Sequence, residues 1–203
     1  RYGPFEWAWR SLTYGRAGFV LPRPRLQMAR GLAISVSTIC FFLGVMAMPL
    51  ADATAIVFTS PILTAFLSGL VLKERVPRAA WVAIALAFAG VLVVLRPNVL
   101  ALGHEAFYPL GAAFGMAWLI ILNRKAAGAA PVLVMQFTLA AVAAPLLVAR
   151  ATLLHLARAP RFTIAAPTGE VVLKCAIVAC TATTGHLLIY SATVRASAAV
   201  VAP

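Results

Sequence analysis

The sequence predicts an all-α fold, a polytopic bundle of transmembrane helices. Of the 203 residues, 63% are hydrophobic and only 11% are charged. A water-soluble domain is apolar over ~45–50% of its residues and carries enough charge to cover its surface. Here the apolar residues fall into blocks of about 20, which is the length of a helix that crosses a bilayer. Lipid solvates such blocks, because a helix satisfies its own backbone hydrogen bonds.

The apolar blocks follow one another along the chain, with charged residues and prolines between them. Arg10 and Arg16 interrupt the first block, and the last is only begun. Asp52 is expected to cap the third helix, Asn123-Arg124-Lys125 to end the fifth, and Asn123 to be its cap. The connection 150–170 alternates basic and apolar residues, so we expect it to lie on the membrane surface. The seven predicted spans and the start of an eighth are 5–22, 28–48, 53–72, 79–96, 106–123, 130–149, 171–193 and 196 onward.

The positive charge of the chain indicates a membrane rather than a nucleic acid as partner. The net charge is +12, from 17 Lys and Arg against 5 Asp and Glu. A nucleic-acid-binding protein gathers such charge on one face, whereas here the basic residues lie at the edges of apolar blocks. Membrane proteins concentrate Lys and Arg in their cytoplasmic loops, beside anionic headgroups.

Signatures of enzymes are absent from the sequence. It contains no GxxxxGK[ST] phosphate loop, no HExxH and no GxSxG. The three histidines are too scattered to predict a metal site, and the three cysteines lie inside apolar blocks as small hydrophobic residues. We therefore expect no cofactor, no metal and no enzymatic activity.

One block of the sequence has a recognisable pattern. It reads MPLADATAIVFTSPILTAFLSGLVLKERV (48–76) and then WVAIALAFAGVLVVLRP (81–97). A proline-bearing turn and small residues precede Ser-Pro inside a helix, and a Lys-Glu-Arg end leads into a helix that closes with Arg-Pro. This block resembles the EamA-type repeat of the drug/metabolite transporter superfamily. PFEWAWRSL (4–12) is similar to the second helix of that family, and RASAAVVAP (195–203) to the matching place in its second repeat.

The resemblance implies two inverted five-helix repeats. Residues 1–97 would form the first repeat without its first helix, and residues 98–203 the second repeat without its last helices. About seven to eight of the family's helices would then be present. Pro61 and Pro203 would occupy matching places and cross the membrane in opposite directions.

The resemblance also implies a function: secondary-active transport of a small metabolite, in or out, by alternating access. The expected partners are a small-molecule substrate, the lipid bilayer and, as a candidate, a second copy in a homodimer, but no nucleic acid. The expected location is the inner (plasma) membrane, with several passes. Two other classes stay open, a membrane-embedded enzyme fragment and a helical scaffold that does not transport.

Polar residues inside the predicted spans are the candidate substrate contacts. An ionisable side chain within a span costs ~2.5–3.5 kcal/mol at the centre of the membrane, so Arg10 either contacts a substrate carboxylate or snorkels to the interface. Pro61 frees the carbonyl of Val57 from its usual donor. Together with Thr59 and Ser60 it forms either a polar site or a packing kink.

Two more candidates share one helix face. His186 and Tyr190 are spaced i, i+4, and Trp118 is predicted to line the same cavity from another helix. A histidine in such a place can also be a satisfied packing residue. Structural roles are predicted for Glu74, as an ion pair at a helix end, and for Gly111 and Gly115, as a close-packing GxxxG motif.

The short loops predict the orientation of the chain. Most of their basic residues fall on one side, which we therefore assign to the cytoplasm. A cysteine at position 75 should be protected from an impermeant thiol reagent outside intact cells, and a cysteine at position 98 should react. Labelling at 75 but not at 98 would reverse the orientation. The residues on the cytoplasmic side are Arg16, Arg23, Arg25, Arg30, Lys73, Arg75, Arg78, Arg124, Lys125 and Arg195.

Overall fold

The computed structural model of the protein describes residues 23–95, 103–130, 132–157 and 166–196. Within these residues all regular secondary structure is helical, so the all-α prediction is confirmed for this part of the chain. The predicted helix 5–22 with Arg10, and Pro203 in the last predicted helix, lie outside the described residues.

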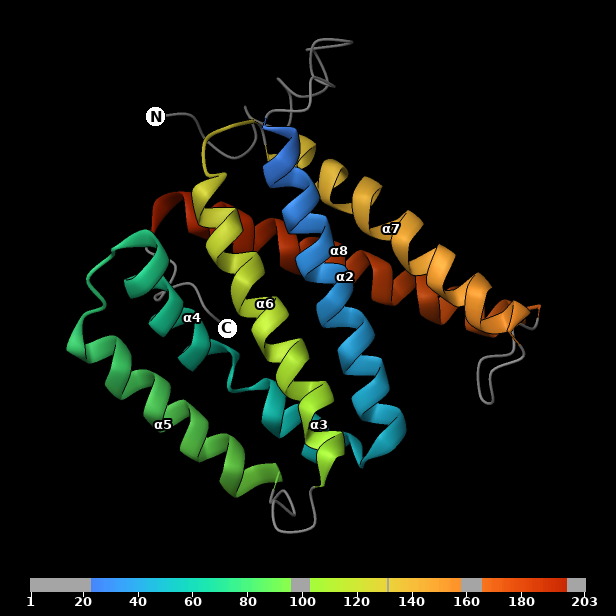
Figure 1. The fold of residues 1–203 in the computed structure, drawn as a ribbon, viewed down its shortest axis with the longest axis horizontal. Helices are drawn as coiled ribbons and strands as arrows, with labels where there is room; N and C mark the ends of the chain where they lie inside the picture. Colours follow the sequence, from blue (N-terminus) through green and yellow to red (C-terminus); the bar gives the residue numbers. More distant parts are fainter. Residues whose placement is uncertain (1–22, 96–102, 131, 158–165, 197–203) are drawn as a thin grey trace. The chain divides into compact units, whose positions relative to one another are not determined.

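Seven α-helices follow one another in the described residues (Figure 1). Helix α4 continues into a π-helical turn, Ser68–Leu72, and a 3-10 turn, His104–Ala106, leads into α6. The helices are α2 (Pro24–Ala47), α3 (Leu50–Val57), α4 (Ser60–Leu67), α5 (Arg78–Leu95), α6 (Phe107–Lys125), α7 (Val132–Leu156) and α8 (Gly169–Arg195).

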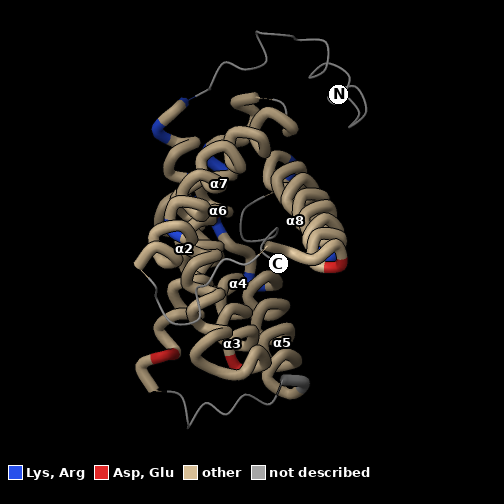
Figure 2. The backbone as a smooth tube through the Cα atoms, turned by 90° about the vertical axis from the view of Figure 1, so that its right-hand side faces the viewer, with Lys and Arg blue, Asp and Glu red and all other residues tan. Residues whose placement is uncertain are grey.

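Five helical stretches of the described residues are long and apolar enough to cross a membrane, and α5 is a shorter apolar helix. Figure 2 shows that most of the length of these helices carries no charged residue. The chain is therefore a multi-pass membrane protein, as its composition predicts. The five stretches are Pro24–Ala47, Leu50–Leu72, His104–Lys125, Val132–Leu156 and Gly169–Arg195.

The chain divides into two compact units. Unit 1 comprises Arg1–Gly31 and Gly128–Ala192, and unit 2 comprises Leu32–Ala127 and Thr193–Pro203. Helices α2 and α8 therefore supply residues to both units. The expected boundary between repeats, at residues 97 and 98, lies inside unit 2, because α6 packs against α3 and α4. The assignment of the repeats stays a prediction.

Helix α6 is the centre of unit 2. Its Ala117, Ile120 and Ile121 are at most 1% exposed and form an apolar core with Leu67 of α4. The partly buried side chains that pack against this core are Leu63, Val71, Leu72 and Trp118.

Helices α2 and α6 approach closely where Gly111 and Gly115 lie, as the GxxxG motif predicts. A Cβ atom added to Gly115 would lie 2.9 Å from the Cβ of Ser37 and 3.0 Å from the carbonyl oxygen of Ala33. At Gly111 it would lie 3.1 Å from the Sγ of Cys40. The hydroxyl of Ser37 donates a hydrogen bond of 2.8 Å to the carbonyl of Ala112 in this interface.

Three predictions about helix ends are wrong. Helix α3 begins at Leu50 after the extended Pro49, so Asp52 lies within the first turn and is not the cap. In the first turn its negative charge still interacts favourably with the positive end of the helix dipole. Helix α6 ends at Lys125, within the predicted Asn123-Arg124-Lys125, but its cap is Ala126, and Asn123 is a buried residue of the helix. Arg124 and Lys125 suit the last turn, at the negative end of the helix dipole. Helix α7 includes residues 150–156 of the predicted surface connection, since their Ala, Leu and Arg residues are good helix formers.

The glycine contact predicts a site-specific effect on stability. Gly115→Val should lower the free energy of unfolding by about 1–3 kcal/mol, because the added atoms meet backbone that cannot move away cheaply. Gly90→Val in α5 is the matched control, since a Cβ there meets nothing within 4 Å. Thermal unfolding of the purified protein in detergent measures both. Equal melting temperatures for the two variants would contradict the contact.

Candidate functional site

An arginine lies buried inside a membrane-length helix of unit 1. Arg30 is 0% exposed, and it lies about 9 Å from the start of α2 at ~1.5 Å per residue. It is therefore part of the span rather than a flanking loop residue. A charged side chain at such a place is costly unless polar groups of the protein surround it.

The guanidinium group of Arg30 is held by α2 itself and by α7. Its Nη1 donates to the Oε1 of Gln27 at 2.5 Å and to the carbonyl oxygen of Met135 at 3.1 Å. Gln27 is also fully buried, and its Nε2 lies 3.2 Å from the Sδ of Met135. The hydroxyl of Thr138 lies 3.2 Å from Gln27 Oε1 and 3.1 Å from the Met135 carbonyl oxygen, both of which are acceptors.

Helix α8 adds an aromatic ring and an imidazole. The guanidinium carbon of Arg30 lies 5.3 Å from the centroid of the Tyr190 ring, which is the geometry of a cation–π contact. Tyr190 is 0% exposed. His186, one turn earlier and half-buried, interacts electrostatically with Arg30. The predicted pair His186 and Tyr190 therefore faces one common group, as the i, i+4 spacing indicates.

These side chains form one polar cluster, which we call the Arg30 network. It joins α2, α7 and α8 within unit 1 and combines a planar cation with a hydroxyl, an amide and an imidazole. A guanidinium surrounded in this way presents donors that match a carboxylate or phosphate. The members of the network are Gln27, Arg30, Met135, Thr138, His186 and Tyr190.

The sequence does contain a signal for Arg30. The predicted span begins at residue 28, which puts Arg30 at its polar edge, whereas α2 begins at Pro24. Proline is well suited to the first turn of a helix. A helix that starts there brings Gln27 and Arg30, at i and i+3, onto one face.

The second group of predicted contacts lies at a break in the span Leu50–Leu72 of unit 2. Helix α3 ends at Val57 and α4 begins at Ser60, so Pro61 stands at the start of a helix and not in the middle of one. This position suits proline, which has no N–H to offer. The hydroxyl of Thr59 donates to the carbonyl of Ile56 at 2.7 Å, one residue before the expected Val57.

Ser60 has an unusual environment at this break. Its side chain is 3% exposed, and its Oγ forms no hydrogen bond with any described residue. A buried hydroxyl in that state costs free energy. It is therefore a candidate to meet a polar group that comes from outside the protein.

Trp118 belongs to the packing of unit 2. It lies 6.3 Å from Phe114, ring centroid to ring centroid, with the two planes 8° apart, and it rests against the apolar core. The predicted contacts thus fall into two groups, with Thr59, Ser60, Pro61 and Trp118 in unit 2 and His186 and Tyr190 in unit 1.

Part of the chain is similar to known proteins. Residues 21–96 match the model of the EamA-like transporter family. The S-adenosylmethionine uptake transporter of Rickettsia prowazekii is 30% identical over 112 residues, which are 55% of this chain and 38% of the relative. The pseudopaline exporter of Pseudomonas aeruginosa is 32% identical over 88 residues, 42% of this chain and 31% of the exporter.

A third relative, the riboflavin transporter of Vibrio cholerae, is 34% identical over 77 residues, 38% of this chain and 26% of the relative. The matched segment thus covers less than half the length of each of these relatives. No solved structure matches the chain.

The Arg30 network predicts that lysine cannot replace this arginine. Arg30→Lys keeps the charge but loses the longer, planar guanidinium that lies over the Tyr190 ring and donates to Gln27 and Met135, so the free energy of unfolding should fall by about 2 kcal/mol. Arg25→Lys, at an exposed position of the same helix, should have no such effect. Thermal unfolding in detergent compares the two. If the Arg30→Lys protein is as stable as the Arg25→Lys protein, the contacts of the Arg30 guanidinium do not stabilise the fold.

Proposed function

We propose that this chain, whose residues 21–96 match the model of the EamA-like transporter family, carries a small metabolite across a membrane by alternating access. The transport would be secondary-active, and the location the inner (plasma) membrane. The bacterial relatives named above are transporters of small molecules, which supports transport rather than enzymatic activity. A homodimer stays a prediction.

The observation that carries the proposal is the Arg30 network. A well-packed apolar side chain in place of a buried charge is often neutral or stabilising. Packing alone therefore does not explain why an arginine occupies this place in the span. Charged residues inside spans typically mark the pathway of a substrate or ion. The network is accordingly the first candidate for contact with substrate, through Arg30, His186 and Tyr190.

The chemistry of the network favours a substrate with an acidic group. The guanidinium of Arg30, which donates to Gln27 and Met135 and lies over the Tyr190 ring, is a planar cation with several N–H donors. A carboxylate matches a guanidinium in both charge and geometry. The relatives are named for S-adenosylmethionine, pseudopaline and riboflavin, which are all small polar metabolites.

The break between α3 and α4 supplies a second polar place and a point of bending. A helix start leaves its first N–H groups outside the helical ladder, and the buried Ser60 hydroxyl lies at that start. Broken spans bind polar groups in other transporters for this reason. We include Thr59, Ser60 and Pro61 in the proposed pathway on these grounds.

The proposal predicts a loss of transport without a loss of folding. The full-length protein in proteoliposomes is tested with radiolabelled S-adenosylmethionine and riboflavin, and a metabolite comparison of cells with and without the gene widens the search. Ser60→Ala with Pro61→Ala should lower the initial rate roughly tenfold, the equivalent of one hydrogen bond to substrate. The amount of protein inserted in the membrane should not change.

A matched double variant controls for the chemical change itself. Pro145→Ala with Thr152→Ala removes a proline and a hydroxyl from exposed positions of α7 and should transport at the unaltered rate. Normal transport by the Ser60 and Pro61 variant would remove the helix break from the pathway. If no probe and no cellular metabolite moves with the unaltered protein, transport itself is refuted.

A further inference from the structure

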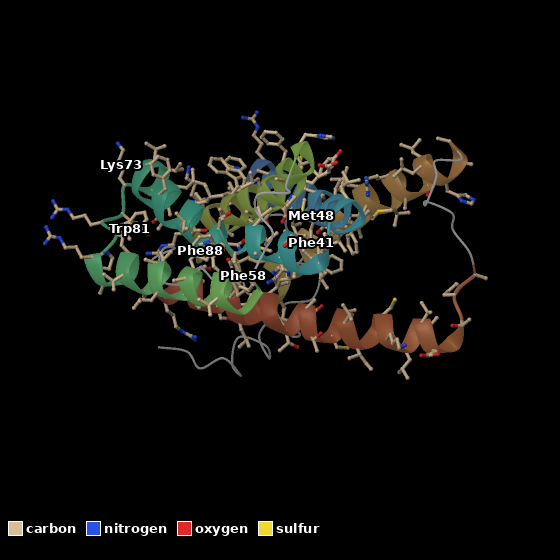
Figure 3. All side chains as sticks on the ribbon, turned by 90° about the horizontal axis from the view of Figure 1, so that it is seen from below. Phe41, Met48, Phe58, Lys73, Trp81 and Phe88 are labelled. Atoms are coloured by element: carbon tan, nitrogen blue, oxygen red, sulfur yellow. The ribbon has the colours of Figure 1, made fainter. Side chains whose placement is uncertain are left out.

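An ion pair between Glu74 and Arg124 lies at one end of unit 2. The Nε of Arg124 is 2.8 Å from the Oε1 of Glu74, and the two side chains are 30% and 21% exposed. The pair confirms that Glu74 is an ion-pair residue, although its partner comes from α6 and not from the neighbouring Lys73 or Arg75. Figure 3 shows Lys73 and Trp81 at this end of the unit, and Phe41 and Met48 away from it.

The ion pair ties together three helix ends. The hydroxyl of Ser68, in the π-helical turn after α4, donates to the second carboxylate oxygen of Glu74 at 2.9 Å. The Nη1 of Arg124 donates to the carbonyl of Thr193, near the end of α8, at 2.8 Å. One carboxylate and one guanidinium thus connect the ends of α4, α6 and α8.

The backbone positions Glu74 for this role. Lys73 has a φ of 56°, in the left-handed region that residues other than glycine rarely adopt. The turn brings the N–H of Glu74 to 3.3 Å from the carbonyl oxygen of Ser68. The carboxylate therefore points back at the end of α4 instead of into solvent.

A second ion pair in the described residues shows the contrast. Lys174 and Glu170 are 2.6 Å apart, but they lie one turn apart in α8 and are 71% and 74% exposed. An exposed pair within one helix contributes little and connects nothing further. The pair Glu74 and Arg124 is half-buried and joins separate elements, so its loss frees them from one another.

We propose that Glu74 and Arg124 form a latch that holds this end of unit 2 closed and opens during the transport cycle. The inference rests on the proposed function, because alternating access requires one end to open while the other is closed. Water can solvate both charges once they part, so an ion pair is a reversible closure in a way that an apolar core is not. The π-helical turn Ser68–Leu72 lies beside the latch, and such turns are frequent at functional sites.

A buried reporter residue tests the latch without any substrate. Ala117 is 0% exposed and belongs to the apolar core of α6. It lies seven residues before Arg124, hence on the same face of the helix. Ala117→Cys is introduced into the full-length protein after the native cysteines Cys40, Cys175 and Cys180 are replaced by alanine. The rate of reaction with a small maleimide in membranes then reports opening.

The variants form a graded series at this reporter. Glu74→Gln removes the charge and should raise the labelling rate roughly tenfold, since hydrogen bonds to charged groups are strong. Ser68→Ala removes one bond of the latch and should raise it less. Glu170→Gln, which breaks the exposed pair, should leave it unchanged.

A reporter in unit 1 separates opening from unfolding. Ala143→Cys, on α7, is 8% exposed and should keep its slow labelling in the Glu74→Gln protein. Faster labelling at both reporters would mean general loosening and would overturn the latch. Equal labelling of Ala117→Cys in the Glu74→Gln and Glu170→Gln proteins would overturn it as well. Because no substrate is needed, either result is distinct from a failure of the transport assay.

Discussion

Inside a bilayer, a polar group has only the protein to bond with, and this constraint organises the structure. Backbone groups meet it by forming helices. The polar side chains of the spans meet it by reaching neighbouring helices, as Ser37 does toward Ala112 and Arg30 does toward Met135. Ser60 is the contrast, because its buried hydroxyl finds no acceptor among the described residues. The places where polar atoms gather, or where one is left over, are therefore the places to look for function.

The Arg30 network and the pair Glu74 and Arg124 differ in how they meet this constraint. In the Arg30 network the guanidinium is fully buried, donates to the Gln27 side chain and the Met135 carbonyl, and lies over an aromatic ring. The pair Glu74 and Arg124 is partly open to water and neutralises itself. A buried guanidinium is suited to binding the carboxylate or phosphate of a partner. A half-exposed pair is suited to forming and breaking, because water can replace each partner.

The sequence was sufficient to predict the class of the fold and the described spans, because length and hydropathy decide what crosses a membrane. It was also sufficient for the Gly111 and Gly115 contact and for the common face of His186 and Tyr190, since both follow from helical spacing. Hydropathy alone did not predict that α2 begins early enough to bury Arg30, because it treats a charge near the edge of a span as the end of that span; the signal was Pro24, which suits a helix start. Nor did the sequence predict that Pro61 stands in the first turn of α4, after a break in the span. That depends on where α3 ends, which the backbone of Phe58 and Thr59 decides.

The length of α7 has a consequence for how the protein fits its membrane. Twenty-five residues at ~1.5 Å each give a helix of about 37 Å, whereas the hydrocarbon layer is about 30 Å thick. Such a mismatch is met by tilting or by extending the helix beyond the hydrocarbon. Arg150 and His155 stand in the last two turns of α7, where their polar groups suit the headgroup layer. Residues 150–156 of the segment predicted to lie on the surface are thus the end of a membrane-length helix, and the thickness of the surrounding bilayer should influence the tilt of that helix.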